Sequence, residues 1–185
     1  MRYSILFIFL FSCANDYTPK PRAFFKINLP EKEYVMFNDN QYNFSFQYPI
    51  YSNIEIDKYS DFLNVNFSIF SGKLYLTYVN LNDNLIEHIE QSRSLAYKHN
   101  NQADMISEQI YINEGKRVYG MLYDYEGITA TSSQFYLTDS AEHFFRGSFY
   151  FNTEINDSIL PINNFVKEDV RFLVESFSWK QIIPE

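Results

Sequence analysis

A single cysteine, Cys13, directly follows a short apolar run near the start of the chain. The run, Tyr3–Phe11, is far shorter than the roughly 20 residues that a membrane-spanning helix needs. Leu10 stands three residues before the cysteine and Ser12 directly before it, the pattern that lipoprotein signal peptidase cleaves. Only a thiolate can take a diacylglyceryl group as a thioether. We therefore predict a signal peptide over residues 1–12 and a lipidated Cys13; a plain secretory signal is the alternative.

Other side chains able to do chemistry are weakly arranged. Ser132 or Ser133 can be combined with Asp139 and His143 as a hydrolase triad, but neither serine sits in a Gly-x-Ser-x-Gly elbow. Five glycines leave no phosphate-cradling loop. The histidines show no zinc-ligand spacing: His88, His99 and His143. We expect no enzyme, no cofactor and no metal, and a serine hydrolase is the least favoured reading.

Composition excludes further classes. Removing residues 1–12 leaves 14 basic and 23 acidic residues, a formal charge of −9, which disfavours nucleic acid as a partner. With no cysteine after Cys13, the domain is expected to have no disulfide and to depend on its hydrophobic core for stability. Aromatic residues make up 19% of the chain and should supply much of that core. Four basic residues remain as surface ion pairs or as a partner contact: Arg93, Lys98, Arg117 and Arg146.

The chain divides into an anchor region and one domain. Residues 13–33 are predicted to be the lipidated N-terminus and an extended tether, because prolines bracket Lys20 and forbid helix there. Charges beside Pro30 at Glu31–Glu33 indicate a solvated turn. Residues 34–185 are expected to form a single globular domain at this length.

Alternation of apolar and polar residues predicts the first strands. Residues 42–48 alternate with a strict period of two and end at a proline. Residues 63–69 repeat the pattern, and Ser71-Gly72 turns the chain into a second strand over 74–78. The two segments are therefore expected to form a hairpin.

A helix is expected after residue 82. Asn84 is the proposed N-cap with Glu87 in capping-box spacing, and His99 stands at the cationic C-terminal end. The inward stripe contains the following residues: Leu85, Ile86, Ile89, Ser92, Leu95 and Ala96. Such a helix packs on a sheet.

Three turn signals split residues 107–152 into four consecutive strands, which indicates an antiparallel meander. After Leu160-Pro161, Asn163 or Asn164 is expected to cap a last helix, and Trp179 to lock its end onto the core. The apolar face of this helix contains Val166, Val170, Leu173, Val174 and Phe177.

This element order predicts the α+β class, an antiparallel meander sheet packed with two main helices in a sandwich. It is similar to the small Mog1/PsbP-type domains, which also begin with a strand ending in proline and finish with a packed helix. A parallel α/β sheet would need more crossover helices than the pattern supplies.

Several motifs, in their order and spacing, resemble the gliding motility lipoprotein GldD family. The resemblance covers about Cys13 to Trp179 and rests on these segments: Tyr17–Arg22, Leu29–Tyr34, Phe44–Pro49, Ser92–His99, Val118–Tyr123 and Ser132–Ser140. It implies an envelope lipoprotein required for gliding motility and type IX secretion. Of its functional positions only Cys13 carries over.

The expected partners are the membrane, through the lipid on Cys13, and protein components of the gliding and secretion machinery. Ala14 is not the aspartate that retains some lipoproteins in the inner membrane, which favours an outer-membrane protein facing the periplasm. The alternative function is a periplasmic ligand- or peptide-binding module of Mog1/PsbP type. Its mark would be a concave aromatic pocket between sheet and helix.

Overall fold

The computed structural model describes residues 27–56, 63–98, 103–127, 129–156 and 158–180. Cys13, His99 and the predicted signal peptide lie outside them. No described helix is long and apolar enough to cross a membrane. The described helices are α1 (Leu85–Tyr97) and α2 (Leu160–Ser176). The described strands are β1 (Tyr34–Phe37), β2 (Phe44–Pro49), β3 (Asn53–Ile56), β4 (Leu63–Phe67), β5 (Gly72–Asn80), β6 (Met105–Asn113), β7 (Val118–Glu126), β8 (Thr131–Thr138), β9 (His143–Phe151) and β10 (Ser178–Trp179).

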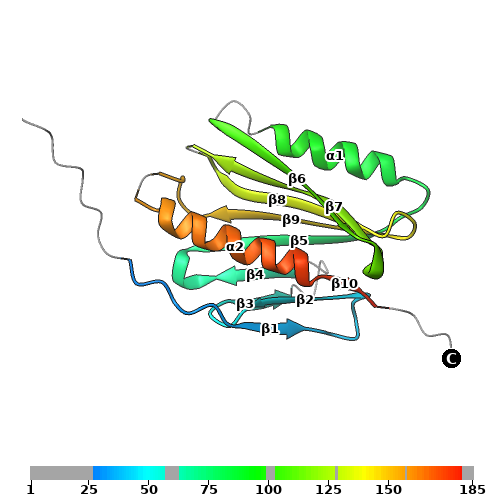
Figure 1. Ribbon diagram of the computed structural model, residues 1–185, viewed down its shortest axis with the longest axis horizontal. Helices are drawn as coiled ribbons and strands as arrows, with labels where there is room; N and C mark the ends of the chain where they lie inside the picture. Colours follow the sequence, from blue (N-terminus) through cyan, green and yellow to red (C-terminus); the bar gives the residue numbers. More distant parts are fainter. Residues whose placement is uncertain (1–26, 57–62, 99–102, 128, 157, 181–185) are drawn as a thin grey trace, which may run out of the picture.

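Seven strands form one antiparallel sheet in the order β3-β4-β5-β9-β8-β7-β6 (Figure 1). The predicted meander is confirmed as the consecutive neighbours β6 to β9, and the predicted hairpin as β4 and β5, which joins the meander where β5 pairs with β9. A small second sheet has the order β1-β2-β10.

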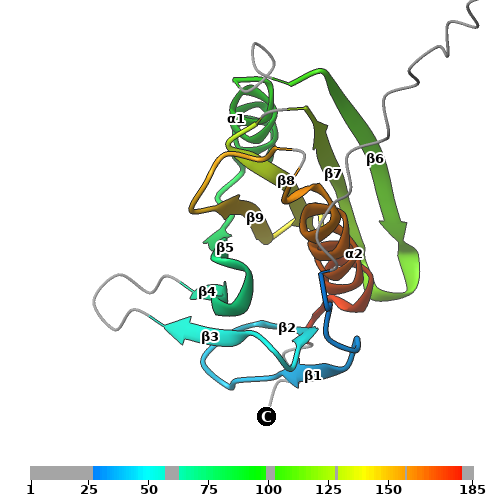
Figure 2. The ribbon, with the colours of Figure 1, turned by 90° about the vertical axis from the view of Figure 1, so that its left-hand side faces the viewer.

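The two helices lie on opposite faces of the large sheet, which confirms the α+β sandwich (Figure 2). α1 covers a cluster of aromatic residues that includes Tyr125 and Phe144. α2 and the small sheet together cover the other face, where the main core lies. Successive side chains of the central strands therefore enter two different cores, because each face of the sheet is covered by a helix.

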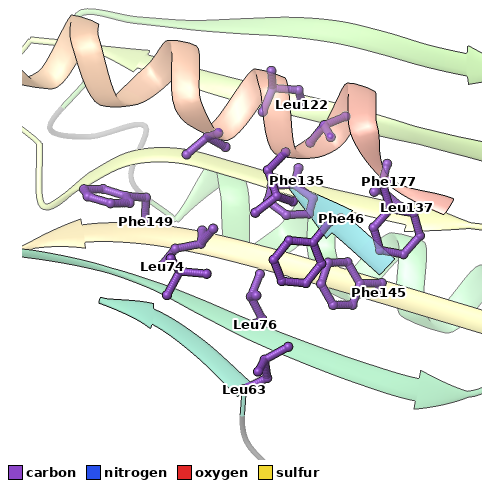
Figure 3. Close-up of a cluster of buried hydrophobic side chains, with 14 of the residues drawn as sticks. Phe46, Leu63, Leu74, Leu76, Leu122, Phe135, Leu137, Phe145, Phe149 and Phe177 are labelled. Carbon is purple, nitrogen blue, oxygen red and sulfur yellow. The ribbon is translucent and has the colours of Figure 1, made fainter. Parts of the chain in front are cut away.

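Aromatic and aliphatic side chains fill the space between the large sheet and α2 (Figure 3). Phe145 lies 4.7 Å from Phe44 and 4.9 Å from Phe177, measured between ring centres, so one ring touches the small sheet and the end of α2. A Cβ at Gly147 would collide with the Phe135 ring, so this position of β9 requires glycine.

Two helix starts differ from the prediction. α2 begins at Leu160 with Pro161 in its first turn, because proline fits where backbone N–H groups have no helical partner. The predicted cap at Asn163 or Asn164 is therefore wrong. Asn84 does precede α1, but its Oδ1 accepts the N–H of Asn82 (2.9 Å) and leaves the helix uncapped, so no capping box forms.

Two predicted inward residues point to solvent. Ile86 is 76% exposed on α1, although Ser92 and Ala96 of the same predicted stripe are buried. Ile69 is exposed because β4 ends at Phe67 and the chain turns through a short 3-10 helix.

A buried carboxylate joins the N-terminal segment to α2. Asp169 is 1% exposed and accepts hydrogen bonds from the Tyr34 hydroxyl (2.9 Å), the Lys32 ammonium (3.1 Å) and the Tyr51 hydroxyl. Lys32 also bonds the Phe165 carbonyl (2.9 Å). Lys32 is thus held against the folded body, in contrast to the solvated turn expected around it.

Replacing Asp169 with asparagine should lower the free energy of unfolding by about 3 kcal/mol, because it removes the buried charged acceptor that Lys32 and two tyrosine hydroxyls share. Urea denaturation monitored by circular dichroism measures the loss. Glu168→Gln is the control, since Glu168 pairs with the same lysine at 2.9 Å but is exposed, and should cost less than about 1 kcal/mol. Equal losses in the two variants would contradict a special role for Asp169.

Buried tyrosines should make the fold labile to alkali. Burial raises the pKa of Tyr123 to about 12 from 10.0, and burial also raises the pKa values of Tyr34, Tyr51 and Tyr125. The unfolded chain loses these protons first, so stability is complete below about pH 10 and falls as the pH rises toward 12. Urea midpoints measured from pH 8 to 11 should show the fall, with a shallower slope for Tyr123→Phe. A flat profile would show that these hydroxyls ionise equally in both states.

Candidate functional site

An open cleft of about 550 Å³ lies at one end of the large sheet. Three segments far apart in the sequence meet there: the β6–β7 turn, the β8–β9 turn and β10, all at the right-hand end in Figure 1. The lining residues are Gly115, Lys116, Arg117, Asp139, Ala141, Glu142, His143, Ser178, Trp179 and Lys180.

The β6–β7 turn carries two of the cations. Asn113 Oδ1 accepts the N–H of Lys116 (3.1 Å) and starts a short 3-10 helix, Glu114–Lys116, after which Arg117 takes a left-handed conformation with φ of 52°. The Lys116 ammonium donates to the carbonyl of Phe177 (3.2 Å) at the C-terminal end of α2. A lysine there satisfies carbonyls that lack helical partners, so it also ties the turn to the helix.

The β8–β9 turn is built on Asp139. Its Oδ1 accepts the backbone N–H groups of Ala141 (3.0 Å), Glu142 (2.9 Å) and His143 (2.8 Å). Burial opposes the negative charge of Asp139, but the three N–H groups outweigh burial and hold the pKa of this carboxyl below its usual range. Asp139 is therefore a structural anion whose charge is compensated by the backbone.

The third side of the cleft is aromatic. The Trp179 ring lies 5.1 Å from the His143 ring and meets Phe177 edge-on at 4.7 Å, which confirms the predicted packing of Trp179 at the end of the last helix. The Trp179 indole donates to the Arg117 carbonyl (3.1 Å). β10 also pairs with β2 through Trp179 and Phe44. The indole is thus fixed on several sides.

The hydroxyl of Tyr78 sets the orientation of His143. It donates to Asn80 Oδ1 at 2.7 Å and lies 2.8 Å from His143 Nδ1. The contact with the hydroxyl holds the Nδ1 side of the imidazole against β5.

The sequence-derived hydrolase triad does not assemble. Both serines are buried: Ser133 donates to Asp124 (2.5 Å) and Ser132 donates to Asn163 on α2. They lie on β8 toward the end opposite the turn that holds Asp139 and His143. At about 3.3 Å per strand residue, the serines and the histidine are too far apart to share a proton.

The four basic residues singled out in the sequence also separate. Arg93 lies 5.9 Å from the Tyr97 ring on α1, Lys98 ends that helix, and Arg146 is half-buried in β9, where burial lowers its pKa. Only Arg117 reaches the cleft. Sequence reasoning missed the two other cations of the cleft, Lys116 and Lys180, because no local pattern links a turn to the C-terminal strand.

The described residues hold no cluster of metal ligands, and the space found under α2 is small. Within the described ranges, no three potential metal ligands among His, Cys, Asp and Glu lie together; His88 packs on Phe144 at 5.3 Å. The alternative function predicted a concave aromatic pocket between sheet and helix; the space beside Leu122 and Val174, on that side of the sheet, has a volume of about 30 Å³.

Comparison with known proteins gives a fold and a family. The solution structure of cyanobacterial PsbP (CyanoP) from Synechocystis sp. PCC 6803 has a TM-score of 0.53 with 13% sequence identity, covering 83% of this chain and 96% of that chain. At that identity it confirms the fold alone. No curated protein matches the sequence.

The family comparison agrees with the resemblance drawn from the motifs. The family described as gliding motility lipoprotein GldD matches residues 14–179, nearly the whole chain after Cys13. The chain therefore belongs to the gliding motility lipoprotein GldD family.

Proposed function

We propose that this protein is anchored in the outer membrane by a lipid on Cys13, faces the periplasm, and supports gliding motility and type IX secretion without catalysis. The observation that carries the proposal is the family match over residues 14–179, which begins directly after Cys13. The domain itself, residues 34–185, would stabilise the assembled machinery through protein contacts.

The surface of the domain supports a role in contact. β6 is the outermost strand of the large sheet and nine residues long, and among the described strands it pairs with β7 alone. Ile110 and Ile112 on this strand are 69% and 63% exposed. Long edge strands with exposed apolar side chains are usually avoided in proteins that act alone.

The hydrogen bonds of Asp169 to Lys32, Tyr34 and Tyr51, here called the Asp169 clamp, support a role for the anchor. The clamp holds Lys32 against α2, so the folded body begins within 19 residues of Cys13. A chain of that length spans at most about 65 Å. Confinement to this distance from a membrane raises the effective concentration of the domain near partners in the same envelope.

Deleting the gene should abolish colony spreading and retain secreted adhesins inside the cells, with both defects restored by the wild-type gene. Spreading assays and immunoblots of cells and medium measure the two effects separately. Normal secretion in a strain that does not spread would remove the type IX part of the proposal, and normal behaviour in both would remove the whole.

Replacing Cys13 with serine should block lipidation and impair spreading, because the hydroxyl cannot accept the diacylglyceryl group. Metabolic labelling with an alkyne palmitate and membrane fractionation check the modification. The control is the same domain exported behind a cleavable secretory signal, which separates loss of the anchor from failure of processing. Full spreading with this unanchored form would show that the protein does not need its anchor in order to function.

A further inference from the structure

We propose that the cleft binds a sugar ring that carries an anionic group, either a carboxylate or a phosphate. This binding activity is separate from the proposed role in motility and does not require it. Charge, an aromatic surface and a built shape point to it independently.

The cleft is lined by several positive charges, although the chain as a whole is negatively charged. The protein carries a formal net charge of −8, yet Lys116, Arg117 and Lys180 line one cleft. The Lys116 and Lys180 ammonium groups donate to backbone carbonyls, Lys180 to that of Asp39 at 2.5 Å, and neither forms an ion pair with a carboxylate of the described residues. Arg117 is exposed. An anion is therefore attracted here although the protein as a whole repels it.

Two acidic residues also line the cleft, and they do not cancel this attraction. Asp139 is only 9% exposed, and its Oδ1 is occupied by three backbone N–H groups. Glu142 is exposed and opposes an anion directly. Three cations and one exposed carboxylate, that of Glu142, therefore line the cleft. Removing the Glu142 charge should strengthen anion binding, whereas removing a cation should weaken it.

The aromatic side indicates a ring. The faces of aromatic side chains carry negative potential, which suits the C–H groups of a sugar. Trp179 supplies an aromatic ring with the His143 ring packed 5.1 Å away, and Ser178 lines the cleft beside them as a hydrogen-bonding side chain. Apolar packing together with hydrogen-bonding groups fits a saccharide better than an inorganic ion.

The cleft is already shaped. Its volume of about 550 Å³ falls within the roughly 300–1,000 Å³ usual for small-molecule sites. The Trp179 indole and the turn residue Asp139 are held by hydrogen bonds to the backbone, so a ligand orders little on binding.

Trp179 is the only tryptophan of the chain and so reports directly on the cleft. The experiment titrates full-length protein in neutral detergent micelles with glucuronate, glucose 6-phosphate, glucose and inorganic phosphate, following tryptophan emission, with calorimetry on the same samples. At least one of the two acidic sugars should bind about tenfold more tightly than glucose and than phosphate. Which acidic sugar binds more tightly tells whether the natural group is a carboxylate or a phosphate.

Three charge variants test the location. Arg117→Gln should weaken binding of the acidic sugar about fivefold, and Glu142→Gln should tighten it about twofold, because each changes one charge at the cleft. Lys98→Gln removes one charge at the far end of α1 and should change nothing. Opposite signs in the first two variants cannot arise from a general loss of fold.

Four results would overturn the proposal. The first is that neither acidic sugar gives a change in emission or in heat. The second is that glucose binds as tightly as glucuronate and glucose 6-phosphate, which removes the anionic group. The third is that phosphate alone binds as tightly, which removes the ring. The fourth is equal affinity in wild type, Arg117→Gln and Glu142→Gln, which places binding elsewhere.

Discussion

The structure depends on one buried carboxylate. Asp169 sits on the inner side of α2 and collects donors from the N-terminal segment, from β1 and from Tyr51 between β2 and β3. An isolated charge at 1% exposure would be strongly unfavourable, so the donors and the carboxylate must be buried together. The small sheet, which has only three short strands, is thereby joined to a helix that already packs on the large sheet.

The layer that contains α2 leads from the Asp169 clamp to the cleft. α2 runs from the contacts of Asp169 to Phe177, whose ring packs on Phe44 and Phe145. β10 follows directly and places Trp179 at the cleft, while Lys116 binds the last carbonyls of the helix. One helix therefore connects the contacts of Asp169 with the candidate binding site.

Sequence periodicity predicted the elements that are long. The meander, the β4–β5 hairpin and both helices have at least two cycles of their pattern, whereas β1 and β3 have four residues each and β10 has two. Asn163 was misread because a capping residue and a buried polar residue look alike until their partner is known, and here the partner is Ser132. Asp169 gave no local signal at all, since its donors stand more than 100 residues away in the chain. The sequence did not predict the cleft for the same reason, because its cations come from segments far apart in the chain.

The claim that Asp169 unites the N-terminal strands with α2 is tested most directly by native-state hydrogen exchange. Opening free energies would be measured for amides of β1 and β2 and for amides in the middle of α2. If the carboxylate makes them one cooperative unit, the most protected amides of both regions open with the same free energy and the same dependence on denaturant. Exchange of β1 and β2 through a separate opening of much lower free energy, with α2 still protected, would contradict the account.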